Sequence, residues 1–177
     1  MSQAPKITLL GSNSGRNAGD AAILAAIMGA ITEQLGPDVE FEVPTTNPKF
    51  VEGNYKGQFK VKAIDVMPWT GSIRFLGIPT FRSVKRSDLT FITDGIIFDI
   101  NLWNPLFNFL ITLVFLVPWA KFCGNKVVCY SVGIGPLNSF FGRLFAKWVG
   151  NACDLIMVRD KDSYDLFRKI GVKKEIH

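Results

Sequence analysis

The strongest constraint on the fold lies at the start of the chain, where an apolar run, a glycine-rich loop and an alanine-rich segment follow one another. Residues 7–10 are apolar with a β-branched start, a pattern typical of a strand buried on both faces. Gly, Ser and Asn dominate residues 11–19, and they tolerate tight turns. The segment from Asp20 onward predicts a helix, with Asp20 as its N-cap or in its first turn. This order predicts the first half of a βαβ unit.

The loop at residues 11–19 has two interpretations. It can hold a phosphate or a carboxylate, because it offers backbone N–H groups beside a helix N-terminus. It is not a P-loop, since no Gly-Lys-Ser/Thr follows, and its glycines are spaced by fours, unlike a dinucleotide fingerprint. From the spacing alone, a tight turn that closes the helix onto the sheet is slightly favoured.

Later segments repeat the alternation of strand and helix. Apolar or alternating runs predict further strands at residues 39–43, 59–66, 87–95, 127–132 and 154–159. Residues 140–149, before the last of these strands, and residues 160–170, after it, have helical patterns. By contrast, Gly and Pro punctuate residues 67–79, where Trp69 and Phe75 would be exposed on a loop. Five or six strands alternating with helices predict an α/β domain with a doubly wound, mainly parallel sheet.

Length, charge and cysteine content limit the functional classes. The 177 residues suffice for one domain with a full core and are short for two. The net charge of +5 is spread along the chain, so we expect no nucleic-acid partner. The same charge is compatible with weak attraction to anionic membranes or to phosphorylated substrates. Three cysteines without metal-ligand spacing and a single terminal histidine predict neither a metal site nor a cofactor.

Two features bear on location. The N-terminus is polar and leads straight into a core strand, so we expect no signal peptide and a cytoplasmic protein, with the inner membrane surface as an alternative. Residues 102–122 are the most apolar stretch, but only residues 106–117 lie uninterrupted between Pro105 and Pro118. A helix buried against the sheet is favoured. A helix resting on a bilayer, anchored by Trp103 and Trp119, comes second, and a membrane span third.

Candidate ligand-binding residues follow several of the predicted strands. Asp94 could accept a hydrogen bond from a sugar hydroxyl or could cap the next turn. Gly133 and Gly135 could let the backbone approach a ligand or could serve helix packing, and their place after a strand favours the ligand. The polar loop at residues 44–48 also follows a strand, although an exposed turn is the simpler interpretation.

Arg159 has two interpretations of nearly equal weight at the end of the last predicted strand. A planar guanidinium there could bind a carboxylate or phosphate bidentately. It could instead form an ion pair with Asp160 or Asp162 that ties down the turn.

Four stretches together resemble the polysaccharide pyruvyl transferase family. Asn17-Ala-Gly-Asp20-Ala-Ala-Ile-Leu24 is similar to the family's opening motif. Three further stretches follow in the family's order: Thr93-Asp-Gly95, Gly133-Ile-Gly-Pro136, and Val158-Arg-Asp160-x-x-Ser163 with Leu166 and Gly171. The sequence departs from the family at Thr93-Asp-Gly-Ile-Ile, where members often have a glycine-rich run, so glycine N–H groups alone would not hold a phosphate there.

The resemblance implies a fold, a reaction and site roles. Residues 1–172 would be one Rossmann-like half of a glycosyltransferase-B-like enzyme, and residues 173–177 would open a linker or the next strand of an absent second domain. Such enzymes transfer pyruvate as a ketal from phosphoenolpyruvate to a sugar of a cell-surface polysaccharide, with a lipid-linked acceptor as one alternative. Arg159 would bind the donor, and Asn17, Gly19 and Asp20 would form the crevice floor on the acceptor side.

The sequence is compatible with other functions. The general acid is not identified, and we expect the 177-residue chain to be inactive without a second domain or a partner chain. The main alternative is a non-catalytic module that docks on a membrane or a partner through Leu102 to Trp119. A nucleotide-binding Rossmann domain is less favoured, because Pro44-Thr-Thr follows the second strand where an acidic residue would hold a ribose.

Overall fold

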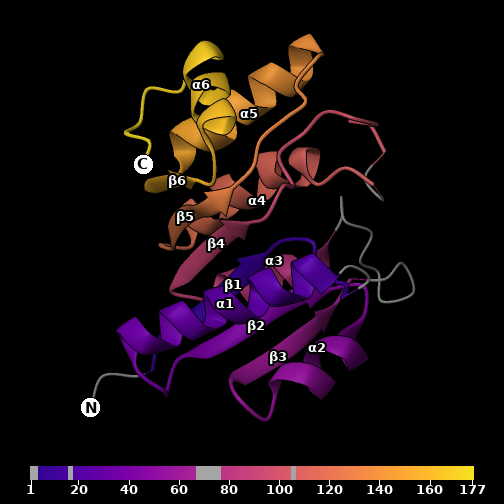
Figure 1. The fold of residues 1–177 in the computed structure, drawn as a ribbon, viewed down its shortest axis with the longest axis vertical. Coiled ribbons are helices and arrows are strands. Elements are labelled where there is room, and N and C mark those ends of the chain that lie inside the picture. Colours follow the sequence, from indigo (N-terminus) through magenta and orange to yellow (C-terminus); the bar gives the residue numbers. More distant parts are fainter. Residues whose placement is uncertain (1–3, 16–17, 67–76, 105–106) are drawn as a thin grey trace.

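The computed structural model describes residues 4–15, 18–66, 77–104 and 107–177, which form one parallel sheet with helices on both faces (Figure 1). The strands are β1 (Lys6–Leu10), β2 (Glu40–Thr45), β3 (Lys60–Asp65), β4 (Leu89–Thr93), β5 (Lys126–Val132) and β6 (Leu155–Val158). The helices are α1 (Ala18–Leu35), α2 (Pro48–Tyr55), α3 (Ile78–Arg86), α4 (Leu110–Phe122), α5 (Phe140–Ala152) and α6 (Lys161–Lys169). The strand order β3-β2-β1-β4-β5-β6 confirms the predicted doubly wound α/β fold.

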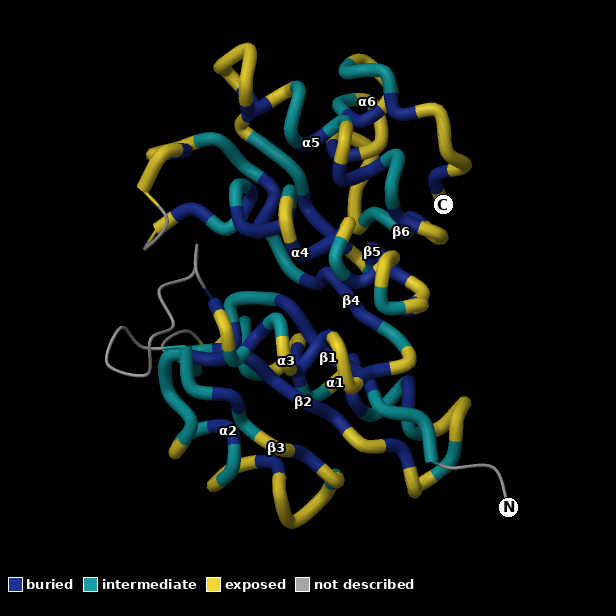
Figure 2. Tube along the Cα trace, turned by 180° about the vertical axis from the view of Figure 1, so that it is seen from behind, coloured by how far each residue is buried: buried dark blue, intermediate teal, exposed yellow. Residues whose placement is uncertain are grey.

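Successive side chains of a strand point to opposite faces of the sheet and therefore belong to two separate hydrophobic cores. Ile7 and Leu9 of β1 pack with α1 and α2, whereas Leu10 points into the opposite core under α3, α4 and α5. The central strands are buried along most of their length (Figure 2). Residues 7–10 are fully buried, which confirms the prediction of a strand covered on both faces.

Strand order places a crevice beside β1. This strand pairs with β2 on one side and with β4 on the other, so the connections after β1 and β4 leave in opposite directions. Ligands of open α/β sheets bind in the crevice at such a switch point, outside the carboxyl ends of the strands. The loops after β1 and β4 therefore define where a site belongs.

The helices differ from the sequence prediction in two places. Helix α2 occupies residues 48–55, which the pattern left without structure; Pro48 opens it, and the Asn47 side chain accepts a hydrogen bond from the Phe50 N–H. Helix α3 begins at Ile78, within the last residues of the stretch rich in Gly and Pro. The predicted loop with Trp69 and Phe75 lies outside the described residues.

The apolar segment forms a helix against the sheet, as predicted. Six residues of α4 are buried, and Pro118 lies inside it. Within the described part of the chain, only α1 has the length and hydropathy of a membrane span. Its buried residues, however, pack on β1 to β3 as in a core helix: Leu24, Ile27, Met28 and Ile31.

The C-terminal residues run beside β6. The His177 N–H donates to the Ile156 carbonyl, and the His177 carbonyl accepts from the Val158 N–H, both at 2.9 Å. This pair of bonds is the pattern of a parallel bridge. Residues 173–177 were predicted as a linker or the next strand, and their last residue pairs with the sheet edge in the manner of a strand.

Candidate functional site

The loop after β1 is fastened to the end of β2 by Asn13. Its side-chain amide donates to the carbonyls of Leu9 at 3.0 Å and Pro44 at 3.3 Å. In return, the Thr45 hydroxyl donates to the Asn13 carbonyl at 2.6 Å. Asn13 is buried, so these bonds satisfy groups that water does not reach. Nothing in the local sequence pattern singled out Asn13, because two of its partners, Pro44 and Thr45, lie on another strand.

Two glycines of this loop lie where other side chains leave no room. A β-carbon added at Gly11 would lie 2.5 Å from the Thr93 hydroxyl, which itself donates to the Leu10 carbonyl at 3.2 Å. Gly15 has a positive φ and lies under the Phe50 ring. These contacts favour the tight-turn interpretation for both positions, since each glycine allows close packing within the domain.

Asp20, at the start of α1, and Asp94, directly after β4, lie close enough to interact electrostatically. Asp20 lies in the first turn of α1, as predicted, and its carboxylate is hydrogen-bonded to Ser12. Burial raises the pKa of Asp20, the negative charge of Asp94 raises it further, and the bond with Ser12 partly offsets both effects. Strand order thus brings together two carboxyl groups that are far apart in the sequence.

A small cavity opens beside Asp94. It has a volume of about 190 Å³ and is lined by Gly11, Ser12, Asp94, Gly95, Ile96, Phe98, Phe107 and Phe109. Its walls combine one carboxylate and a hydroxyl with aromatic rings. Sugar rings suit such a lining, because the carboxylate accepts hydrogen bonds from hydroxyls while apolar groups pack against the C–H faces.

The end of β5 is irregular and joins this crevice. Ser131 has a positive φ, and the pairing with β6 shifts register between Cys129 and Val132. The Gly133 N–H donates to the Asp94 carbonyl at 3.3 Å, while Gly135, at φ +101°, donates to the Ile97 carbonyl at 2.8 Å. The loops after β4 and β5 are therefore held side by side.

Arg159 lies directly over Gly133. A β-carbon added at Gly133 would be 2.5 Å from both Cζ and Nε of the guanidinium. Nε donates to Asp160 at 3.0 Å, so the predicted ion pair with a neighbouring aspartate is present. The Arg159 side chain is still 53% exposed, which leaves the guanidinium accessible.

The start of α6 holds this arrangement in place. Asp160 caps the helix by accepting from the Ser163 N–H at 2.8 Å, and hydrogen bonds from Ser163, together with Arg159, lower its pKa. The buried Ser163 hydroxyl accepts from the Ile134 N–H at 3.0 Å. Helix α6 therefore fixes both the loop after β5 and the base of the Arg159 side chain.

The predicted site residues form two groups at the carboxyl ends of the strands. Asp20 and Asp94 make the group at β1 and β4, with Gly19 in the first turn of α1; Asn17 lies outside the described residues. Gly133, Gly135 and Arg159 make the group at β5 and β6. Parallel strands are about 4.8 Å apart, so β1 and β6 are separated by about 14 Å, a span suited to two substrates side by side.

Comparison with known proteins places this geometry in a family. The model of the polysaccharide pyruvyl transferase family matches residues 17–177, nearly the whole chain. The chain belongs to the polysaccharide pyruvyl transferase family. No curated protein matches the chain.

Family membership fits the two groups along the sheet edge. A polysaccharide pyruvyl transferase acts on a saccharide acceptor, and the cavity beside Asp94 has a lining suited to a sugar. Within the described residues, the motif stretches lie at the carboxyl ends of strands or at the helix starts that follow them, while Leu166 and Gly171 lie near the end of α6 and after it. The family motif is therefore a spatial unit built from β1, β4, β5 and β6.

Metal ligands and reactive thiols add little to this site. Among the described residues, no group of three or more His, Cys, Asp or Glu side chains is arranged to hold a metal ion. Cys129 and Cys153 are buried in the core with their sulfurs 3.4 Å apart, and their mutual hydrogen bond and burial raise the pKa of Cys129. They fill space in the core as small apolar groups.

Proposed function

We propose that this protein transfers pyruvate from phosphoenolpyruvate to a saccharide of a cell-surface polysaccharide. The proposal rests on the position of the Arg159 guanidinium. It lies over the Gly133 backbone, at the same carboxyl end of the sheet as the Asp20–Asp94 pair. An accessible cation and a pair of carboxylates match a substrate pair of one anion and one polyol.

The donor binds at the β5–β6 group. Phosphoenolpyruvate carries a carboxylate and a phosphate, and a guanidinium binds either of them bidentately. Because Asp160 engages Nε, the donor is bound by the terminal nitrogens of Arg159. The turn at Gly133 lets the anion approach the backbone, since a side chain there would occupy the guanidinium position.

The acceptor binds at the β1–β4 group. The reaction adds one sugar hydroxyl across the enol double bond: its proton goes to the terminal carbon, and its oxygen bonds to the carbon that carries the phosphate. A second hydroxyl of the sugar then displaces inorganic phosphate from that carbon and closes the ketal. The Asp20–Asp94 pair holds the acceptor hydroxyls, and the raised pKa of Asp20 suits a group that receives and returns a proton.

The described residues do not supply every charge that this reaction needs. Phosphoenolpyruvate carries two anionic groups, and Arg159 can neutralise only one of them well. We therefore propose that a second domain or a partner chain closes over the crevice, as in glycosyltransferase-B-like enzymes, and completes the donor site. The domain boundary near residue 172 is part of the same proposal.

Thermal unfolding with candidate ligands tests the proposal. Phosphoenolpyruvate should raise the melting temperature of the wild-type protein and should not raise that of Arg159→Ala. Arg82→Ala, which removes an exposed arginine from α3, should respond like the wild type. Ligand at ten times its Kd stabilises the folded state by about 1.4 kcal/mol, a shift of about 3–6 °C for a domain of this size.

The alternatives give different results in the same assay. A response to nucleotide sugars but not to phosphoenolpyruvate would indicate the nucleotide-binding interpretation. The absence of any response to anions would place the donor site outside this chain and leave the acceptor role. Equal stabilisation of wild type and Arg159→Ala by phosphoenolpyruvate would refute the role of Arg159.

A further inference from the structure

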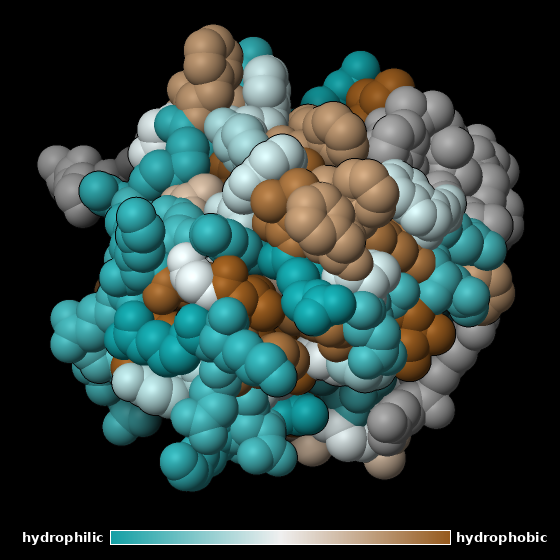
Figure 3. Space-filling view, turned by 90° about the horizontal axis from the view of Figure 1, so that it is seen from above, coloured by the Kyte–Doolittle hydropathy of each residue, from teal (hydrophilic) through white to brown (hydrophobic). Residues whose placement is uncertain are grey.

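Helices α3, α4 and α5 lie next to one another on one face of the sheet and present large apolar side chains to solvent. The exposed residues of these helices include Ile78, Phe115, Phe122, Phe140, Phe141 and Trp148. Phe122 is the extreme case, with 83% of its surface exposed. Seen from the β6 end of the sheet, apolar side chains gather in a cluster amid hydrophilic ones (Figure 3). An apolar surface of this kind marks an interaction site.

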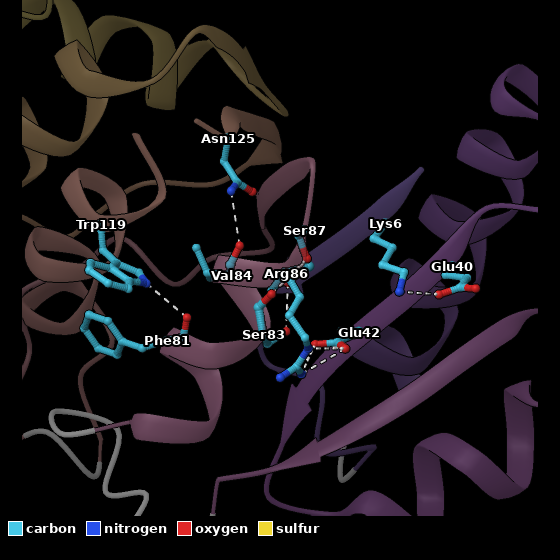
Figure 4. A network of polar contacts seen from close by, with 11 residues as sticks. Lys6, Glu40, Glu42, Phe81, Ser83, Val84, Arg86, Ser87, Trp119 and Asn125 are labelled. Carbon is cyan, nitrogen blue, oxygen red and sulfur yellow. Dashed lines mark hydrogen bonds and ion pairs between the residues drawn. The ribbon is translucent and has the colours of Figure 1, made fainter. Parts of the chain in front are cut away.

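A groove of about 730 Å³ runs between α3 and α4. Trp119 forms its wall and is held rigidly: its Nε1 donates to the Phe81 carbonyl at 3.0 Å, and its ring stacks on Phe122 with centroids 5.8 Å apart (Figure 4 shows the bond to Phe81). Phe115 lines the same groove from the preceding turns of α4. The groove is thus preformed and aromatic.

A second groove continues this surface across α4. It measures about 400 Å³ and lies between α4 and α5, with Trp148 on its far side. Pro118 lines both grooves and forms the ridge between them. The two grooves and their ridge make one apolar face, which we call the α3–α5 face.

The three helices of the α3–α5 face carry charge of one sign. None of the three helices contains Asp or Glu, whereas each contains Lys or Arg: Arg82, Lys85, Arg86, Lys121, Arg143 and Lys147. By contrast, α2 and α6 carry both signs, and α1 carries only acidic residues. Arg86 and Lys121 pair with carboxylates of strand or loop residues.

Two cations lie at the groove itself. Arg82 and Lys85 line it from α3, one turn apart, next to Ile78 and Phe81. No ion pair joins either of them to a carboxylate within the described part of the chain. The groove therefore combines aromatic side chains with unneutralised positive charge.

We propose that the α3–α5 face docks on an anionic phospholipid bilayer. Aromatic and aliphatic side chains enter the boundary between headgroups and acyl chains, while Lys and Arg beside them bind the anionic headgroups. A second copy of the chain fits this face poorly, because a symmetric contact would bring cations against cations. With 13 residues, α4 extends over only about 20 Å, so the contact is peripheral rather than spanning.

Flotation with lipid vesicles tests the proposal. Vesicles of phosphatidylcholine with roughly one-third phosphatidylglycerol should bind the protein at low salt, and phosphatidylcholine alone should bind it at least tenfold less. The bound fraction should fall as salt is raised, since salt screens the headgroup charge. The inference goes beyond the proposed reaction, so Arg159→Ala should bind vesicles like the wild type.

Matched variants locate the contact. Phe115→Ser/Phe122→Ser and Arg82→Glu/Lys85→Glu should each lower binding to the anionic vesicles at least tenfold. Ile23→Ser/Leu35→Ser on α1 makes a similar apolar change on the other side of the sheet, and Lys49→Glu/Lys56→Glu makes the same charge change at α2; both should bind like the wild type. All altered side chains are exposed, and an unchanged melting temperature verifies that each variant is folded.

Three results would overturn the proposal. The first is a wild-type protein that ignores anionic vesicles. The second is equal binding by the groove variants and the wild type. The third is a dimer in sedimentation equilibrium that the Phe115→Ser/Phe122→Ser variant dissociates, without vesicle binding by the wild type, because that result would assign the face to a second copy.

Discussion

Replacing Gly133 by alanine should weaken anion binding while leaving the fold intact. The added β-carbon would lie 2.5 Å from Cζ and Nε of Arg159 and 2.6 Å from Nη2. Ordinary contact begins near 3.4 Å, so the guanidinium must move by about 0.9 Å. The Arg159 side chain is half exposed and flexible, so it can move at little cost in stability.

The functional effect of this displacement should be much larger than its effect on stability. A hydrogen-bonded ion pair contributes about 1.5–3 kcal/mol, and a misplacement of about 1 Å removes most of its geometry. We expect the affinity for phosphoenolpyruvate and for inorganic phosphate to fall about 10- to 100-fold. The unfolding free energy should change by less than about 1 kcal/mol.

Calorimetric titration of four proteins isolates the cause. These are wild type, Gly133→Ala, Arg159→Ala and the double variant, compared as a double-mutant cycle. If Gly133 acts through Arg159, the alanine should have no further effect once the arginine is gone. Gly29→Ala is the matched control, because its added β-carbon meets nothing within 4 Å and lies in the interior of α1. An equal loss of affinity with and without Arg159 would refute the reasoning.

Two further predictions concern the loops at the crevice. Asn13→Ala should lower the unfolding free energy measured in urea by about 2–3 kcal/mol, because the buried Leu9 and Pro44 carbonyls lose a hydrogen-bond donor. The control Asn54→Ala removes one exposed hydrogen bond within α2 and should lower the unfolding free energy by less than about 0.5 kcal/mol. Equal losses in the two variants would contradict the proposed role of Asn13 in joining β1 to β2. Asp20→Asn should alter the pH dependence of stability, since burial and Asp94 raise the pKa of Asp20 above its ordinary value of 3.8. The folded protein then binds this proton more tightly than the unfolded chain, so wild type loses stability as pH rises from about 3.8 through the raised pKa. The variant should lack that loss and be at least as stable at pH 7, and parallel pH profiles of the two proteins would exclude the raised pKa.

Local sequence patterns predicted those helices and strands that are determined by interactions between residues close together in the chain. The buried run at residues 7–10 and the helices predicted at residues 140–149 and 160–170, which the structure has as α5 and α6, follow from burial and from helical patterning. Helix α2 was missed, because its composition is polar and its stability comes from packing Val51 and Tyr55 on the sheet.

For the candidate site, too, the sequence predicted some features and only the structure showed the others. The sequence alone indicated which residues end strands, and the family motif named Asp20, Asp94, Gly133 and Arg159 as candidates. It could not show that Arg159 lies on Gly133 or that Asn13 joins β1 to β2, because those contacts join segments 26 and 31 residues apart.

Tertiary structure decided the surfaces as well. Helix periodicity indicates that α4 is apolar all round, but only its neighbours determine which side the sheet covers and which side solvent meets. The α3–α5 face arises from three helices without Asp or Glu that are separated in the chain and adjacent in space. The physical reason is the parallel sheet: its crossovers place sequence-distant helices side by side and gather strand ends at one edge, which no local pattern records.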